Sequence, residues 1–117
     1  MAKKIDATIY VSPEYSEPVY SHGHTLCATR SQLIDAFGEP TDNGDTINVN
    51  FNWDFCIEVL DNEIFCCLHD WQNSGVSEFA AIDWVIRADN KFNSNITKEI
   101  LNSVLSSNTY NVTIKKK

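Results

Sequence analysis

The chain has 117 residues, of which 43% are hydrophobic, and its 16 acidic side chains against 9 lysines and arginines give a net charge of −7. This length suits one domain with its own hydrophobic core, spanning residues 1–117, and the composition excludes an intrinsically disordered chain. The acidic surface disfavours direct nucleic-acid binding, and no apolar run approaches the roughly 18 residues that a membrane-spanning helix needs.

The first residues and the cysteines predict the compartment. The segment 1–6 is polar, and no apolar segment with a small-residue cleavage site follows it, so we expect no secretory signal. We therefore expect a cytoplasmic protein whose 4 cysteines are reduced thiols or metal ligands rather than disulfides. An acidic surface of this kind serves solubility, and it can also match a basic partner protein.

The N-terminal part of the chain predicts one strand and a long irregular segment. Residues 5–11, "IDATIYV", alternate and are rich in β-branched side chains, which indicates a strand. Pro13 and Pro18 break this regularity, because proline cannot donate to a sheet ladder. Residues 12–28 are therefore predicted to be loop-rich, with at most a short edge strand.

The histidine-rich stretch "SHGHTLC" lies inside this loop-rich segment. Zinc sites in proteins use His and Cys ligands, and three such residues occur here: His22, His24 and Cys27. Their spacing is looser than that of a paired C-x-x-C signature, which makes them weak metal candidates. We favour a solvent loop, with Cys27 packed beneath the following helix as a small apolar side chain.

A short helix follows this segment. Thr29 and Gln32 predict a capping box at its start, since each side chain can bond to the backbone of the other. Gly38 and Pro40 predict its end, because glycine suits the residue after a helix and proline cannot continue one.

A long hairpin comes next. Apolar and polar residues alternate over 47–59, which predicts a strand with a bend near Asn52. Asp61 and Asn62 tolerate positive φ and predict a two-residue turn into the return strand 63–71. With Leu60 opposite Glu63, the pairs on the core face are Val59 with Ile64, Ile57 with Cys66, Phe55 with Leu68 and Trp53 with Asp70. The pairs on the other face are Glu58 with Phe65, Cys56 with Cys67, Asp54 with His69 and Asn52 with Trp71.

The remaining chain predicts a strand at 82–88 and a closing helix that starts near Ser94. Two alternatives stay open for residues 108–117: a short strand at 112–114, or a flexible basic tail. Together the elements predict an α+β fold, an antiparallel curved sheet of four to five strands with two helices in the order β-α-β-β-β-α. The helices are expected to cover one face of the sheet.

The predicted hairpin brings together side chains that could hold a metal ion. Adjacent cross-strand pairs place Cys56, Cys67, Asp54 and His69 on one face, within reach of a tetrahedral ion. The group depends wholly on the register, because a one-residue slip sends half of it to the other face. We favour packed thiols beside an exposed Asp54–His69 pair, and we expect no metal and no other cofactor.

No sequence motif predicts catalysis. The chain contains no G-x-S-x-G, no phosphate-binding glycine loop and no H-E-x-x-H. Asp70 beside indoles is a candidate acid or base, although such a carboxylate more often accepts structural hydrogen bonds. We therefore expect that the protein is not an enzyme.

Aromatic side chains on the less covered face of the predicted sheet favour a binding role. Phe65 and Trp71 lie on that face, with Asp54 and Glu58 at their rim. An apolar centre with a charged rim is typical of protein interfaces. The alternative is that the closing helix or the first strand covers these aromatic rings.

A resemblance to known proteins rests on four segments of the chain: "SQLIDAFGEP", "WDFCIEVLDNEI", "LHDW" and "IDWVI". From Thr29 to about Leu105, the chain resembles a loose group of short, mostly uncharacterised phage-encoded proteins. Their shared pattern is a helix ending in F-G-x-P, a strand with Trp, a hairpin, a D-W strand end and a closing helix. The resemblance implies a phage accessory protein in the cytoplasm of the host cell.

Three functional hypotheses follow, of which the third is a metal-dependent or metal-structured protein. The leading one is a phage protein that binds a host protein, in particular a defence component, and inhibits it without catalysis through Phe65, Trp71, Asp54 and Glu58. A homodimer is compatible with this role, and neither direct nucleic-acid binding nor a membrane is involved. The alternative is an oligomeric sponge that sequesters a cyclic nucleotide or a related immune second messenger, with Arg30 and Arg87 binding the ligand.

Overall fold

Six stretches of the chain are described by the computed structural model: residues 4–12, 21–41, 51–70, 77–89, 91–106 and 110–116. Within them the chain forms six strands and two helices. In chain order these are β1 (Ile5–Val11), β2 (Ser21–Thr29), α1 (Arg30–Phe37), β3 (Asn52–Val59), β4 (Asn62–His69), β5 (Ala81–Ala88), α2 (Lys91–Ser106) and β6 (Tyr110–Lys116).

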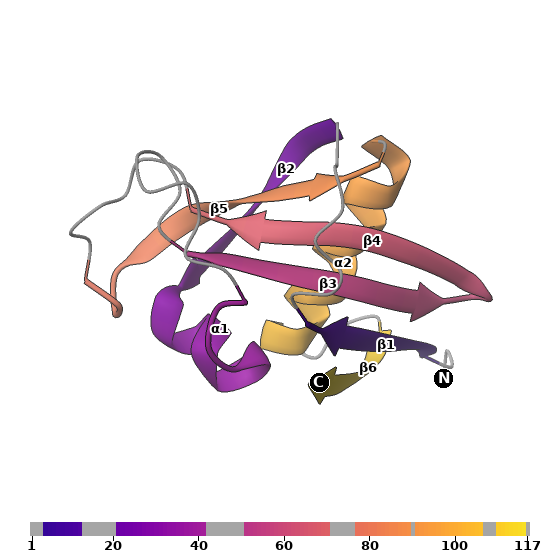
Figure 1. Ribbon diagram of the computed structural model, residues 1–117, viewed down its shortest axis with the longest axis horizontal. Helices are drawn as coiled ribbons and strands as arrows, with labels where there is room; N and C mark the ends of the chain where they lie inside the picture. Colours follow the sequence, from indigo (N-terminus) through magenta and orange to yellow (C-terminus); the bar gives the residue numbers. More distant parts are fainter. Residues whose placement is uncertain are drawn as a thin grey trace.

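The described strands form one mixed sheet in the order β2-β5-β4-β3-β1-β6, and α2 crosses behind it in the view of Figure 1. β1 pairs in parallel with β6, whereas the other described pairs are antiparallel. The prediction of an α+β fold with two helices is therefore confirmed. The prediction of four to five purely antiparallel strands is wrong, since the described residues form a sheet of six strands with one parallel pair.

Two segments account for this difference: one that is predicted as loop-rich, and one for which the sequence leaves a strand and a flexible tail open. β2 occupies residues 21–29, most of which fall in the predicted loop-rich segment 12–28. Antiparallel pairing with β5 holds it, and its alternation buries Leu26 and Ala28 against the core. β6 pairs with β1 over residues 110–116, so the described part of the predicted tail is a strand and not a flexible segment.

The hydrophobic core lies between the helices and one face of the sheet. The largest fully buried side chains come from both, namely Trp53, Trp84, Phe37, Phe55, Ile9, Leu33, Ile57, Leu68, Ile86, Ile100 and Leu101. Each buried indole N–H has an acceptor, since Trp53 donates to the carbonyl of Gly38 and Trp84 to that of Ala28. The expectation that the helices cover one face is confirmed.

The ends of α1 follow the predicted signals. The Thr29 hydroxyl accepts from the Gln32 N–H at 3.0 Å, and the Gln32 side chain accepts from the Thr29 N–H at 2.9 Å. The helix ends at Gly38, whose φ of 83° is left-handed backbone that favours glycine. α2 begins three residues before the predicted Ser94, and neither described helix is long and apolar enough to cross a membrane.

The β3–β4 hairpin has a different register from the predicted one. Its two turn residues are Leu60 and Asp61, with φ of 50° and 64°, and not Asp61 and Asn62. The resulting pairs are Val59 with Asn62, Glu58 with Glu63, Ile57 with Ile64, Cys56 with Phe65, Phe55 with Cys66, Asp54 with Cys67, Trp53 with Leu68 and Asn52 with His69. This is a shift of two positions, so every residue keeps its predicted face and changes its partner. The part of the predicted strand before residue 51 lies outside the described residues.

Candidate functional site

The face of the sheet turned away from the helices, called here the outer face, carries most of the sequence-predicted site residues. On β3, β4 and β5, strand alternation places on it, among others, Asp54, Cys56, Glu58, Glu63, Phe65, Cys67, His69, Val85 and Arg87. Their exposure divides the face into two regions. Away from the hairpin turn, Asp54 and His69 are buried and hydrogen-bonded, whereas toward the turn the carboxylates are exposed.

Asp54 belongs to the buried region and does not form the predicted exposed rim. Its side chain is only 5% exposed, and Thr41 satisfies it from the segment after α1. The Thr41 hydroxyl donates to Asp54 Oδ2 at 2.9 Å and accepts from the Asp54 N–H at 2.8 Å. These bonds give Asp54 a structural role, fixing the segment that follows Gly38 against the start of β3.

His69 and Arg87 form a second buried polar contact. The Arg87 Nε–H donates to His69 Nε2 at 3.0 Å, which makes Nε2 the acceptor, and Nδ1 lies 2.7 Å from the Asp70 carbonyl. Since a carbonyl can only accept, the proton of a neutral His69 is on Nδ1. Neither ring nitrogen is then a vacant metal ligand, so the predicted Asp54–His69 pairing is replaced by a His69–Arg87 pairing.

The candidate metal cluster of the hairpin does not assemble among the described residues. The actual register puts Cys56 opposite Phe65 and Cys67 opposite Asp54, so the two thiols do not face each other. Among the described residues, no three His, Cys, Asp or Glu side chains lie close enough to hold a metal ion. Burial raises the pKa of the Cys67 thiol to about 12 and also raises that of Cys66, which keeps both protonated at neutral pH.

His24 and Cys27 of the histidine-rich stretch do not form a metal site either, because they lie on opposite faces of the sheet. His24 and Cys27 are three positions apart on β2, so their side chains point to opposite faces of the sheet. His24 Nδ1 lies 2.9 Å from the Ser94 hydroxyl of α2, on the helix side, and Ser94 is fully buried. Cys27 opposes Asp83 and is exposed, so the expectation that it packs beneath α1 is wrong.

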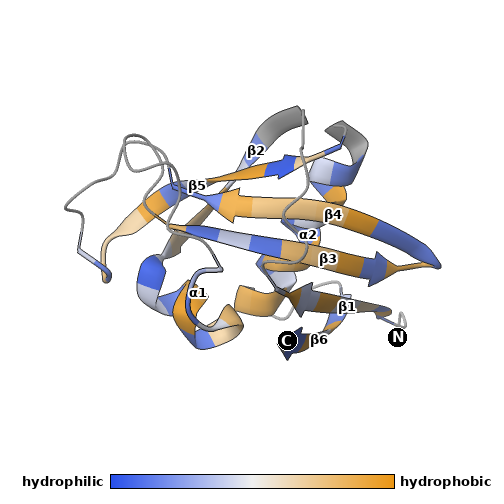
Figure 2. Cartoon of the chain, viewed as in Figure 1, coloured by the Kyte–Doolittle hydropathy of each residue, from blue (hydrophilic) through white to orange (hydrophobic). Residues whose placement is uncertain are grey.

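The exposed region of the outer face is called here the hairpin end and consists of Glu58, Leu60, Asp61, Glu63 and Phe65. It projects past β1 and β5 at the right of Figure 1, and Figure 2 shows hydrophilic residues at its tip. Leu60 exposes 69% of its surface, Phe65 exposes 36%, and the three carboxylates are also exposed. A hollow of about 420 Å³, lined by residues 58–63, opens at the turn. Apolar and acidic side chains thus share one protruding surface.

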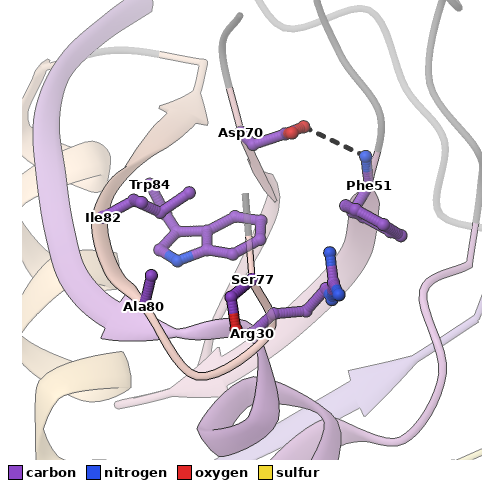
Figure 3. Close-up of a pocket in the computed structure, with 7 residues that line it drawn as sticks. All are labelled: Arg30, Phe51, Asp70, Ser77, Ala80, Ile82 and Trp84. Atoms are coloured by element: carbon purple, nitrogen blue, oxygen red, sulfur yellow. Dashed lines mark hydrogen bonds between the residues drawn. The ribbon is translucent and has the colours of Figure 1, made fainter. Parts of the chain in front are cut away.

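Arg30 lies at a cavity on the other end of the sheet, drawn in Figure 3. Its guanidinium stacks 4.4 Å from the centre of the Phe51 ring, and Ser77, Ala80, Ile82 and Trp84 close the remaining sides. The Asp70 carboxylate accepts from the Phe51 N–H at 3.0 Å, which is the structural role favoured for this aspartate. The cavity holds only about 10 Å³, the space of one water molecule.

The two arginines of the sponge hypothesis do not meet within one chain. The Arg30 cavity includes Ile82, which is five residues before Arg87 on β5. At about 3.3 Å per residue, the two positions are roughly 17 Å apart along the strand. Arg87 is moreover engaged with His69.

Of the four residues predicted to bind a partner, Phe65 and Glu58 lie at the hairpin end, Asp54 is buried, and Trp71 lies outside the described residues. Sequence analysis missed Leu60 and Asp61 as site residues. The signal that could have found Leu60 is its position beside the predicted turn. Leucine is rare at the positive φ that such a turn needs, so the sequence favours Asp61 and Asn62 instead.

No family model, no curated protein and no solved structure matches the chain. The resemblance to phage-encoded proteins therefore stays an expectation from the sequence. The functional proposal rests on the geometry of the described residues.

Proposed function

We propose that the protein binds a protein of its host through the hairpin end and acts by this binding, without catalysis. The partner proposed from the phage resemblance is a component of host machinery, in particular of host defence, which the bound protein inhibits in the host cytoplasm. Charge supports this role, because the chain carries −7 and exposes carboxylates around two apolar side chains.

The observation that carries the proposal is the accumulation of unfavourable features at the hairpin end. Leu60 has φ of 50°, and a left-handed conformation costs a non-glycine residue about 1–2 kcal/mol. The carboxylates of Glu58 and Glu63 face each other across the strands, and like charges in that position are destabilising. Local features that lower stability are expected where a surface serves a function.

A partner would relieve the charge repulsion and cover the exposed apolar side chains. An apolar contact would cover Leu60 and Phe65, and basic residues at its edge would neutralise the facing carboxylates of Glu58 and Glu63. Aromatic residues near the centre of an interface commonly account for most of its binding free energy. Phe65 is therefore the residue expected to matter most in binding.

The test is affinity capture from a lysate of the host with three forms of the protein: wild type, Phe65→Ala and Phe79→Ala. Phe79 exposes 72% of its surface in the turn before β5 and serves as a matched control away from the hairpin end. We expect a host protein that wild type and Phe79→Ala retain equally and that Phe65→Ala retains about tenfold less. Equal retention of the same proteins by all three forms would contradict the proposal.

A further inference from the structure

A second hollow lies on the helix side of the same hairpin, where the turn, the start of α2 and the start of β6 meet. Its volume is about 260 Å³. Val59, Ile64, Ile96 and Tyr110 supply apolar walls, while Leu60, Asn62, Glu63 and Asn93 form its edge. Drug-sized ligands occupy roughly 300–1,000 Å³, so this cavity is suited to one long side chain rather than to a nucleotide.

The described charged residues that line this cavity, or that hydrogen-bond to its lining residues, are acidic. Glu63 lines it directly, Asp89 accepts a hydrogen bond from Asn93 at its edge, and Glu99 accepts one from the Tyr110 hydroxyl at 3.5 Å. These carboxylates come from three separate parts of the chain. Lys4, which lines a neighbouring hollow together with Tyr110, does not line this cavity.

We propose that this cavity receives a lysine or arginine side chain of the partner. The apolar walls would contact the methylene stem, and the surrounding carboxylates would hold the charged head near the opening, as long basic side chains prefer. This inference rests on the proposed function, because Leu60, Asn62 and Glu63 border both this cavity and the hollow at the turn. A basic segment could therefore contact both sides of the turn.

The first test needs no partner, because small probes with one alkyl chain and different charges report the chemistry of the cavity. Hexylammonium, hexanol and hexanoate are titrated separately, and NMR shifts of the Ile64 and Ile96 methyl groups and the Tyr110 ring are followed. We expect hexylammonium to bind about tenfold more tightly than hexanoate, with hexanol between them. The Glu99→Gln variant is expected to weaken hexylammonium about threefold and to leave hexanol unchanged. Equal binding of all three probes, or no shift with hexylammonium, would overturn the inference.

The second test uses the host protein captured by wild type. Ile96→Trp fills the cavity from a half-buried position of α2, and Val104→Trp is the control at a half-buried position further along the same helix. We expect Ile96→Trp to lose at least tenfold in affinity and Val104→Trp to bind like wild type. If Ile96→Trp binds normally while Phe65→Ala does not, the cavity inference is wrong and the proposed function stands. If both variants bind normally, both are wrong.

Discussion

Replacing Glu63 by lysine is expected to stabilise the fold, although the residue lies at the proposed binding surface. Glu58 and Glu63 are directly opposed, which brings their Cβ atoms to about 5 Å. A like-charge pair there costs a few tenths of a kcal/mol, and an opposite-charge pair contributes about 0.2–1 kcal/mol. The Glu63→Lys variant is therefore expected to gain about 1 kcal/mol in the free energy of unfolding, or roughly 3–6 °C in Tm.

A double-mutant cycle separates this pair from the general effect of lower net charge. Urea unfolding is measured for wild type, Glu63→Lys, Glu58→Gln and the double variant. We expect a coupling of about 0.5–1 kcal/mol between positions 58 and 63 at low salt, which decreases at about 1 M salt because the Debye length falls to about 3 Å. A coupling below about 0.2 kcal/mol at low salt would refute the register, since the sequence-predicted register places Phe65 opposite Glu58.

Four further predictions test other parts of the structure. Thr29→Ala removes the capping box of α1 and is expected to lower the free energy of unfolding by about 1 kcal/mol in a denaturant titration; an unchanged value would contradict the observed cap. Iodoacetamide followed by mass spectrometry should modify exposed Cys27 first and the buried thiols only after unfolding. Burial raises the pKa of the Cys67 thiol from 9.0 to about 12, so the unfolded chain releases this proton at a lower pH than the folded protein does. The free energy of unfolding is therefore unaffected by this thiol below about pH 9 and decreases as the pH rises toward 12. The fall should be shallower in Cys67→Ala, and an identical pH profile would contradict the assigned burial. Calorimetry with cyclic nucleotides should give no heat, because the Arg30 cavity has room for one water molecule; measurable heat would favour the sponge hypothesis instead.

The sequence predicts local features of this fold well because short-range chemistry determines them. The capping box of Thr29 and Gln32, the stop at Gly38 and the strand pattern of residues 5–11 need no knowledge of distant parts of the chain. Period-two alternation also assigns the faces of β3 and β4 correctly, even though the register is wrong by two residues. The face of the sheet on which a side chain lies depends only on whether its position in the strand is odd or even. Its partner on the neighbouring strand depends on which residues form the turn.

The features that the sequence does not predict depend on long-range pairing. β2 is polar and follows two prolines, and it becomes a strand through pairing with β5, about 60 residues away. The sequence of β6 is only a weak signal for a strand, and this segment becomes a strand through parallel pairing with β1.

The candidate site likewise has a part that local alternation predicts and a part that depends on strand pairing. Phe65 and Glu58 could be predicted because parity places them on the outer face. The metal cluster could not be judged without the true register, since one turn residue decides which thiols and carboxylates are neighbours. The role of Leu60 was hidden because leucine rarely occupies left-handed backbone.

The most direct test of the central claim is the affinity of the captured host protein for Leu60→Asn and for Phe79→Asn, measured by titration calorimetry. Both side chains are about 70% exposed, and asparagine suits the left-handed backbone at position 60, so neither change is expected to unfold the protein. Binding through the hairpin end predicts that Leu60→Asn loses tenfold or more in affinity while Phe79→Asn stays within about twofold of wild type. Equal affinities of the two variants and wild type would contradict a binding surface at the hairpin end.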